Sequence, residues 1–227
     1  MLAACAKASG SDRFASVLFA DLPKSEANQV RAHELAFDAI KAGPGDFPVG
    51  VTISMQDIQG VGEGNKADEI AQAVYGPWIA QAAKADFVGV QTYTRVRVDA
   101  KGIMPPPKGA ELTAAGYEFY PEALEATIRY AAKMTGKPIY VTENGIGTDD
   151  DSRRIAYIDR ALAGVRACID DGIDVRSYLH WSLLDNYEWV FGYKQRFGLV
   201  AVDRTTFKRT PKPSALHLGA RAKANRV

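Results

Sequence analysis

The chain has 227 residues, of which 47% are hydrophobic, so it can bury a substantial core, and we expect a single domain over residues 1–227. Its net charge of +1, with acidic and basic residues interspersed, offers no electrostatic surface for nucleic acid or an anionic membrane. No apolar run approaches membrane-spanning length, and the two cysteines, Cys5 and Cys168, cannot form a disulfide framework, which is typical of a cytoplasmic protein.

Hydrophobic periodicity predicts an alternation of helices and strands. In chain order the pattern predicts a helix at 29–42, a strand at 47–54, a helix at 66–85, a strand at 86–94, a helix at 121–135, a strand at 138–142, a helix at 151–171, a strand at 175–184 and a terminal helix after Pro211 and Pro213. The apolar face predicted for the helix at 66–85 consists of Ile70, Ala73, Val74, Trp78 and Ala82. Residues 101–112 are expected to form one long loop.

This order of elements predicts an α/β fold with a parallel sheet, because the first three strands are short, continuous apolar runs. Four βα units are too few for a closed TIM (β/α)8 barrel, which needs eight strands. An open nucleotide-binding sheet is disfavoured, because no glycine-rich phosphate loop follows any strand. We therefore expect a half barrel.

Two of the predicted strands end in carboxylates and turn residues. Residues 141–145 read Val-Thr-Glu-Asn-Gly, and residues 181–189 read Trp-Ser-Leu-Leu-Asp-Asn-Tyr-Glu-Trp. Barrel enzymes place their catalytic groups at the C-terminal ends of parallel strands. Carboxylates beside aromatic residues indicate chemistry on a sugar.

These runs resemble glycoside hydrolase family 1, the retaining β-glucosidases, and the resemblance extends from about residue 32 to residue 213. The matching segments, in the family's order, are residues 86–90, 116–118, 120–122, 142–145, 181–189, 192–193 and 196–199. The resemblance implies the second half of the barrel, strands five to eight. Several matching runs in the right order are a far more specific signal than one short motif.

The resemblance places Glu143 at the position of the family's nucleophile, and Tyr93 at that of the tyrosine that orients it. A nucleophilic carboxylate forms a glycosyl ester that water later hydrolyses. The non-catalytic alternatives are that Glu143 is an acidic residue of a loop and that Tyr93 is a tyrosine of the barrel interior. Gln91 takes a substrate-binding position where the family usually has Asn, and its extra methylene is expected to push the amide outward.

The resemblance also implies a sugar-binding site. Glu188 and Trp189 match the family's sugar-binding pair, Trp181 its platform tryptophan, and Phe197 a wall of the pocket. A carboxylate accepts hydrogen bonds from sugar hydroxyls, and indole rings cover the apolar face of a pyranose. Because relatives that act on 6-phosphosugars lack the Glu–Trp pair, a neutral hexose is expected. Ordinary core packing is the alternative for either tryptophan.

The family's general acid, a glutamate in an Asn-Glu-Pro run, has no counterpart in this sequence. General acid catalysis contributes about 10²–10⁴-fold, so hydrolysis of ordinary β-glycosides is expected to be impaired. The alternatives are a non-catalytic carbohydrate-binding protein and an inert product that folds only as an oligomer. No metal or organic cofactor is implied, and the three histidines lack metal-ligand spacing.

A half barrel exposes two edge strands, whose unpaired backbone N–H and C=O groups can pair with another chain. We therefore expect either a two-fold homodimer or a complex with a complementing N-terminal half barrel. In the dimer, Asp185 or Glu188 of the second copy would approach the position of the absent acid. A separation of about 5–5.5 Å from Glu143 would permit retaining hydrolysis.

Overall fold

The computed structural model describes residues 2–12, 14 and 22–227 of the chain. The chain divides into two compact units, Met1–Val49 and Gly50–Val227. The first unit contains helices α1 (Leu2–Ser9) and α2 (Leu22–Ala42). Helix α2 includes the helix predicted at 29–42 and begins earlier, whereas α1 was not predicted. The single domain over residues 1–227 stays a prediction.

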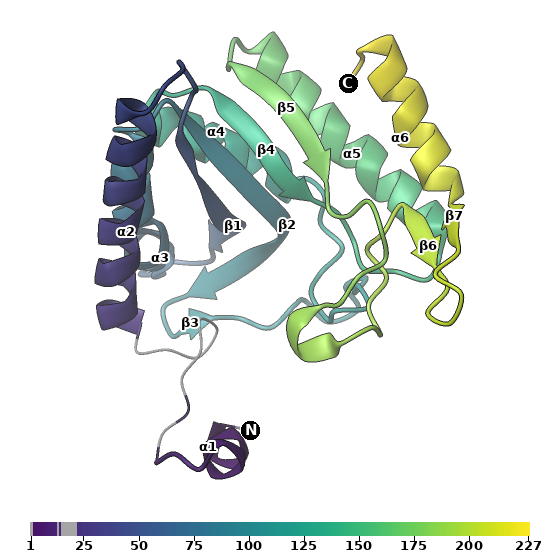
Figure 1. The fold of residues 1–227 in the computed structure, drawn as a ribbon, viewed down its shortest axis with the longest axis horizontal. Helices are drawn as coiled ribbons and strands as arrows, with labels where there is room; N and C mark the ends of the chain where they lie inside the picture. The colour runs from purple at the N-terminus through teal and green to yellow at the C-terminus, as the bar shows by residue number, and fades with distance from the viewer. Residues whose placement is uncertain (1, 13, 15–21) are drawn as a thin grey trace. The chain divides into compact units, whose positions relative to one another are not determined.

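The second unit is built on a sheet whose main strands run parallel. These strands lie in the order β1 (Gly50–Gly60), β2 (Phe87–Asp99), β4 (Ile139–Asn144) and β5 (Val175–His180). A short strand, β3 (Gly102–Ile103), pairs antiparallel with the end of β2. Figure 1 shows that the four parallel strands point toward the same side, where the connecting loops gather. The four predicted strands are therefore confirmed, with β1 and β2 longer than expected and β5 shorter.

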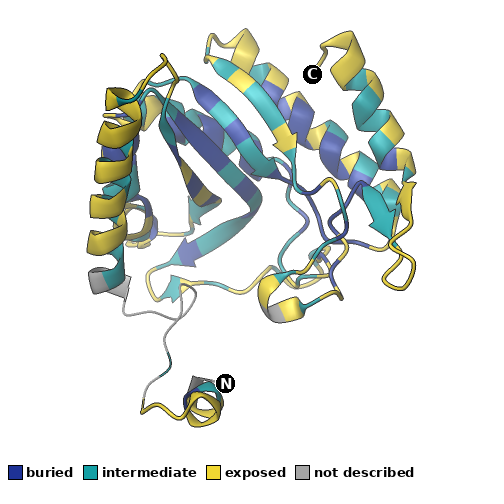
Figure 2. Ribbon diagram, viewed as in Figure 1, coloured by how far each residue is buried: buried dark blue, intermediate teal, exposed yellow. Residues whose placement is uncertain are grey.

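Helices α3 (Ala67–Ala82), α4 (Ala123–Thr135) and α5 (Asp151–Asp170) pack on the sheet. Helix α6 (Pro213–Ala224) packs against α5 and confirms the predicted terminal helix, which begins at Pro213 itself. The core lies between the sheet and these helices and contains buried residues such as Val88, Val141 and Leu124. In Figure 2 the buried residues concentrate in the central strands and along one side of α5.

The buried face of α3 differs from the predicted one. Tyr75 and Ile79 are buried at this face, in place of Ala73 and Val74. Tyr75 packs into the core while its hydroxyl group bonds the backbone of Gln56 in β1. An amphipathic tyrosine can bury its ring provided that its hydroxyl group finds such a partner.

Strand β4 carries an extra residue where it approaches its end. Val90 of β2 pairs with Val141, but the next residue, Gln91, pairs with Glu143, so Thr142 is inserted into the ladder. The pairing with β5 shifts in the same place. A bulge of this kind bends a strand and re-aims its side chains. It therefore sets the direction of Glu143.

The loop after β5 contains the remaining short elements. The 3₁₀ helix η1 (Trp189–Phe191) lies within it, and strands β6 (Val200–Val202) and β7 (Arg209–Pro211) form a small antiparallel sheet. The chain leaves β5 at His180, four residues before the predicted end. Among the helices of the described ranges, none is long and apolar enough to cross a membrane.

Candidate active site

The carboxylate of Glu143 is held by two side chains of β2. The Tyr93 hydroxyl group donates to Oε2 over 2.5 Å, and the Gln91 amide Nε2 donates to Oε1 over 2.8 Å. Burial, followed by the hydrogen bond to Glu143 and its charge, raises the pKa of Tyr93 far above its ordinary value. Tyr93 therefore keeps its proton and remains a donor, and both carboxylate oxygens are fixed in place.

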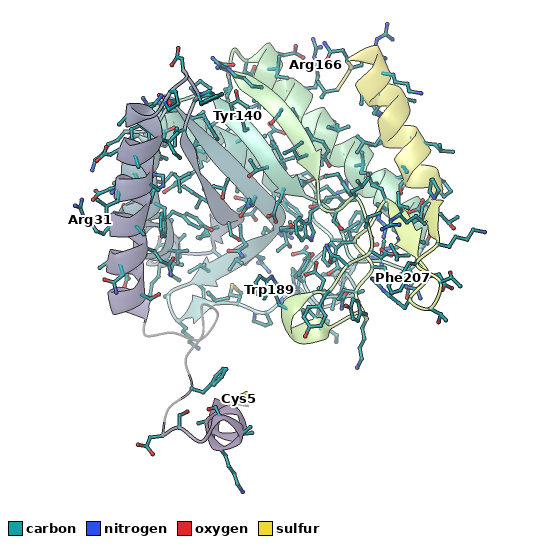
Figure 3. All side chains as sticks on the ribbon, in the orientation of Figure 1. Cys5, Arg31, Tyr140, Arg166, Trp189 and Phe207 are labelled. Atoms are coloured by element: carbon teal, nitrogen blue, oxygen red, sulfur yellow. The ribbon has the colours of Figure 1, made fainter. Side chains whose placement is uncertain are left out.

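The loop after β5 brings aromatic residues to the same place. The indole Nε1 of Trp181 donates to Glu188 Oε1 over 3.0 Å. Phe197 is buried and its ring meets the ring of Tyr93 edge to face, with centroids 6.1 Å apart. Trp189, labelled in Figure 3, lies on η1 and is 64% exposed. Its indole is therefore free to contact a ligand.

These groups surround a pocket of about 380 Å³. Six residues named from the sequence line it, namely Tyr93, Glu143, Trp181, Glu188, Trp189 and Phe197. Gln91 is not among its lining residues and reaches the site only through Glu143. The polar groups in the lining include two carboxylates and two phenols beside indole and phenyl rings, a combination suited to binding a sugar.

Tyr117, which is not among the predicted site residues, also lines the pocket. Burial and then the charge of Glu188 raise the pKa of Tyr117 above its ordinary value, so its hydroxyl group stays protonated. Tyr117 belongs to a segment that contributed to the family resemblance, and that was the available signal. How close this loop lies to the strand ends depends on tertiary contacts, which no sequence pattern indicates.

The sequence model of glycosyl hydrolase family 1 matches residues 53–227. The chain belongs to this family. Within the curated relatives, a β-galactosidase of Saccharolobus solfataricus is 32% identical over 224 residues, covering 83% of this chain and 46% of the relative. A β-galactosidase of Sulfolobus acidocaldarius is 38% identical over 148 residues, covering 59% of this chain and 30% of the relative.

Solved structures of this family have the same arrangement of elements. The apo structure of β-glucosidase 1317 matches 99% of this chain with a TM-score of 0.92 and 49% identity, over 56% of its own length. The β-glycosidase BGL167 matches 99% of this chain with a TM-score of 0.90 and 43% identity, over 55% of its own length. This chain thus spans about half the length of these two family members.

The hydrogen bond that Gln91 makes to Glu143 corrects the expected direction of the Gln91 amide. The longer side chain was expected to carry the amide outward from the Asn position, yet the amide reaches Glu143. The physical reason is the bulge, which pairs Gln91 with Glu143 across the two strands and brings the side chains together. Gln91 therefore contacts the candidate nucleophile.

Asp185 and Glu188 are the two acids that a second copy is expected to contribute. The side chain of Asp185 is buried, and its Oδ1 accepts hydrogen bonds from Lys212 Nζ and from the backbone N–H of Gly198, each over 2.9 Å. It is therefore committed to an internal ion pair. Of these two carboxylates, Glu188 alone lines the pocket.

Proposed function

We propose that this chain forms the C-terminal half of a (β/α)8 barrel and carries the nucleophile and the sugar-binding walls of a retaining β-glycosidase. Strands β1, β2, β4 and β5 would be the barrel's strands five to eight. The observation that supports this most strongly is the Glu143 carboxylate, held by Tyr93 and Gln91 in a pocket walled by indoles. A small neutral β-glycoside is the proposed substrate.

In the proposed reaction, an oxygen of Glu143 attacks the anomeric carbon while the bond from that carbon to the aglycone oxygen breaks. The electron pair of the broken bond leaves with the aglycone. The product of this step is a glycosyl ester of Glu143, and water then hydrolyses it. Trp181 fixes Glu188 by its indole N–H, which leaves the carboxylate of Glu188 oriented to accept hydrogen bonds from sugar hydroxyls.

An ordinary aglycone must be protonated as it leaves. Among the described residues that line the pocket, the carboxylates are Glu143 and Glu188, and both have the roles given above. We therefore propose that this chain by itself hydrolyses unactivated glycosides poorly, by the factor of about 10²–10⁴ that a general acid supplies. Aglycones that leave readily as anions escape this limit.

The acid is proposed to come from a partner. The main sheet ends at β1 and β5, and in the described part of the chain no further strand pairs with either edge. A second copy or a complementing half barrel would cover these edges. We also propose a cytoplasmic location, in keeping with Cys5 and Cys168, which form no disulfide.

Covalent labelling tests the proposed nucleophile. The probe is a dinitrophenyl β-glucoside in which fluorine replaces the hydroxyl group next to the anomeric carbon. Fluorine slows both steps, and the dinitrophenolate leaves without an acid, so the glycosyl ester should accumulate. Mass spectrometry should find one fluoroglucosyl group per chain, on Glu143. The Glu143→Gln variant, which keeps the size of the side chain, should stay unlabelled.

The other results of this experiment also decide between functions. Reversible sugar binding without labelling would contradict the proposal and support a carbohydrate-binding protein that does not turn over its ligand. The observation that favours such a function is the lack of a general acid among the described residues of the lining: its two carboxylates, Glu143 and Glu188, both have other proposed roles. Neither labelling nor binding would support an inert chain.

A second prediction concerns Glu188. The Glu188→Gln variant should bind gluconolactone about 10- to 100-fold more weakly, because hydrogen bonds to a charged group contribute about 1.5–3 kcal/mol. The fluorescence of Trp181 and Trp189, which line the same pocket, reports the binding. Glu111→Gln removes an exposed carboxylate outside the pocket and should leave the affinity unchanged. Equal affinities in all three proteins would remove Glu188 from the sugar site.

A further inference from the structure

The bulge in β4 interrupts the sheet directly behind the candidate nucleophile. The last pair that β4 makes with β2 is Glu143 with Gln91. Beyond it, the carbonyl groups of Thr92 and Tyr93 continue along β2 without a β4 partner in the ladder. A buried carbonyl group that lacks a partner is costly, so other groups must bond these two.

Side chains replace the interrupted ladder. The Asn144 amide Nδ2 donates to the carbonyl oxygen of Thr92 over 2.7 Å. The hydroxyl group of Tyr157 donates to the carbonyl oxygen of Tyr93 over 2.8 Å and lies 3.2 Å from Asn144 Nδ2, from which it accepts. Asn144 follows Glu143 in sequence. One hydroxyl group thus connects the residue that donates to the nucleophile with the residue next to the nucleophile.

Asn144 is also fixed from the opposite side. Its Oδ1 accepts from the hydroxyl group of Tyr178 in β5 over 2.9 Å, and its backbone carbonyl accepts from the N–H of Trp181 over 2.8 Å. Asn144 is fully buried, so the atoms with which it makes these hydrogen bonds are shielded from water. The side chain therefore ties together β2, β4 and β5 where the pocket begins.

Tyr157 is itself held rigidly. It lies on α5, is fully buried, and packs edge to face against Phe119 with ring centroids 5.6 Å apart. Burial raises the pKa of Tyr157 well above its ordinary value, so the hydroxyl group keeps its proton and remains a donor. The hydroxyl group does not line the pocket and has no place in the bond-making steps.

We propose that Tyr157 is a positioning residue, whose hydroxyl group sets the geometry between Tyr93 and Glu143 by tying the Tyr93 backbone to Asn144. The inference rests on the proposed function, because Glu143 must be the nucleophile for this geometry to affect a reaction. Misplacement of a reacting group by about 1 Å can slow a step about 10²-fold. A link made behind the site is therefore sufficient to control the rate.

The test is the Tyr157→Phe variant, which keeps the ring and removes the link. Labelling of Glu143 by the fluoro-glucoside should become about 10- to 100-fold slower, while the affinity of the non-covalent complex changes little. The matched control is Tyr75→Phe. Tyr75 is also buried, and its hydroxyl group bonds the backbone of Gln56 in β1, a strand that carries neither Glu143 nor its donors. This control should label at the rate of the unmodified protein.

A second readout does not depend on any reaction. The short hydrogen bond between Tyr93 and Glu143 should give a strongly deshielded proton resonance, identified by its absence from the Tyr93→Phe variant. We expect Tyr157→Phe to shift or abolish this resonance and Tyr75→Phe to keep it. Tyr178→Phe, which removes the hydrogen bond to Asn144 from β5, should act in the same direction and serves if Tyr157→Phe does not fold.

The two readouts separate the two proposals. If the unmodified protein is not labelled at Glu143, the proposed function fails. The positioning role is then tested only by comparing the proton resonance of the unmodified protein with that of Tyr157→Phe. A normal resonance and normal labelling in Tyr157→Phe would overturn the positioning role while leaving the nucleophile in place. Absence of the resonance from the unmodified protein would also overturn it, because the hydrogen bond said to be positioned would not be formed.

Discussion

Replacement of Glu143 by alanine should slow the release of dinitrophenolate from dinitrophenyl β-glucoside by at least about 10³-fold, because loss of a covalent nucleophile costs up to about 2 × 10⁶-fold in a well-studied enzyme. In the unmodified protein we expect a burst of one dinitrophenolate per chain, since formation of the ester needs no acid here, whereas its hydrolysis lacks the general base that the same absent residue would supply. Stopped-flow absorbance measures the burst. A Glu143→Ala variant with an undiminished burst would contradict the assigned nucleophile.

Azide provides the positive control for this variant. The small anion fits the space that the carboxylate leaves and attacks the anomeric carbon from the same side as Glu143 would. It should restore release and give the α-glucosyl azide, whose inverted configuration identifies the face of attack. Glu69→Ala, which removes an exposed carboxylate on α3, should keep the full burst without azide. A β-configured azide would place the attack on the opposite face.

The strands of this fold could be predicted because their hydrophobicity is local. The runs that became β1, β2, β4 and β5 are apolar in themselves, and the turns at Gly136 and Gly172 adopt the positive φ angles that stop signals require. The buried face of α3 could not be predicted, because the hydroxyl group of Tyr75 takes its partner from a different strand. Tertiary partners of this kind leave no periodic signal.

In the site, too, features that depend on local sequence could be predicted, and features that depend on tertiary contacts could not. Glu143, Trp181 and Glu188 were named because each lies in a run that resembles the family, and they do line one pocket. The hydrogen bond of Gln91 was missed because it depends on the register shift in β4. The contacts of Tyr157 depend on where the ladder between β2 and β4 ends, which is at the pair Gln91–Glu143. A bulge is a property of how two strands pair, so the sequence of either strand alone does not predict it.

A buried arginine joins the loop after the nucleophile to the rest of the fold. Arg154 on α5 is fully buried and pairs with Asp151. Its Nη2 donates to the carbonyl oxygens of Thr148 and Arg196, over 2.8 and 2.6 Å. Thr148 lies in the loop after β4, and Arg196 precedes Phe197 of the pocket wall. The guanidinium group therefore connects the loop that follows β4, the strand of Glu143, to the loop that carries Phe197.

The Arg154→Met variant should lower the free energy of unfolding by about 3–5 kcal/mol, because it leaves Asp151 and two carbonyl groups without their buried partner. Urea unfolding followed by circular dichroism measures the change. Arg166→Met is the matched control on the same helix, where the ion pair with Asp170 is more than half exposed on both sides. Exposed pairs contribute little, so the control should unfold close to the unmodified protein. Similar losses in both variants would contradict the special role of Arg154.

The pH dependence of stability provides an independent check of this ion pair. Burial raises the pKa of Asp151, but hydrogen bonds from the backbone and hydroxyl group of Ser214, and from Arg154, outweigh burial and hold the pKa below its ordinary value of 3.8. A lowered carboxyl pKa stabilises the fold fully above the ordinary value, and this stabilisation is lost as the pH falls through the folded-state pKa. The stability difference between the unmodified protein and Arg154→Met should therefore be largest at neutral pH and shrink in acid. A difference that grows as the pH falls would show that Asp151 is not the partner that makes Arg154 stabilising.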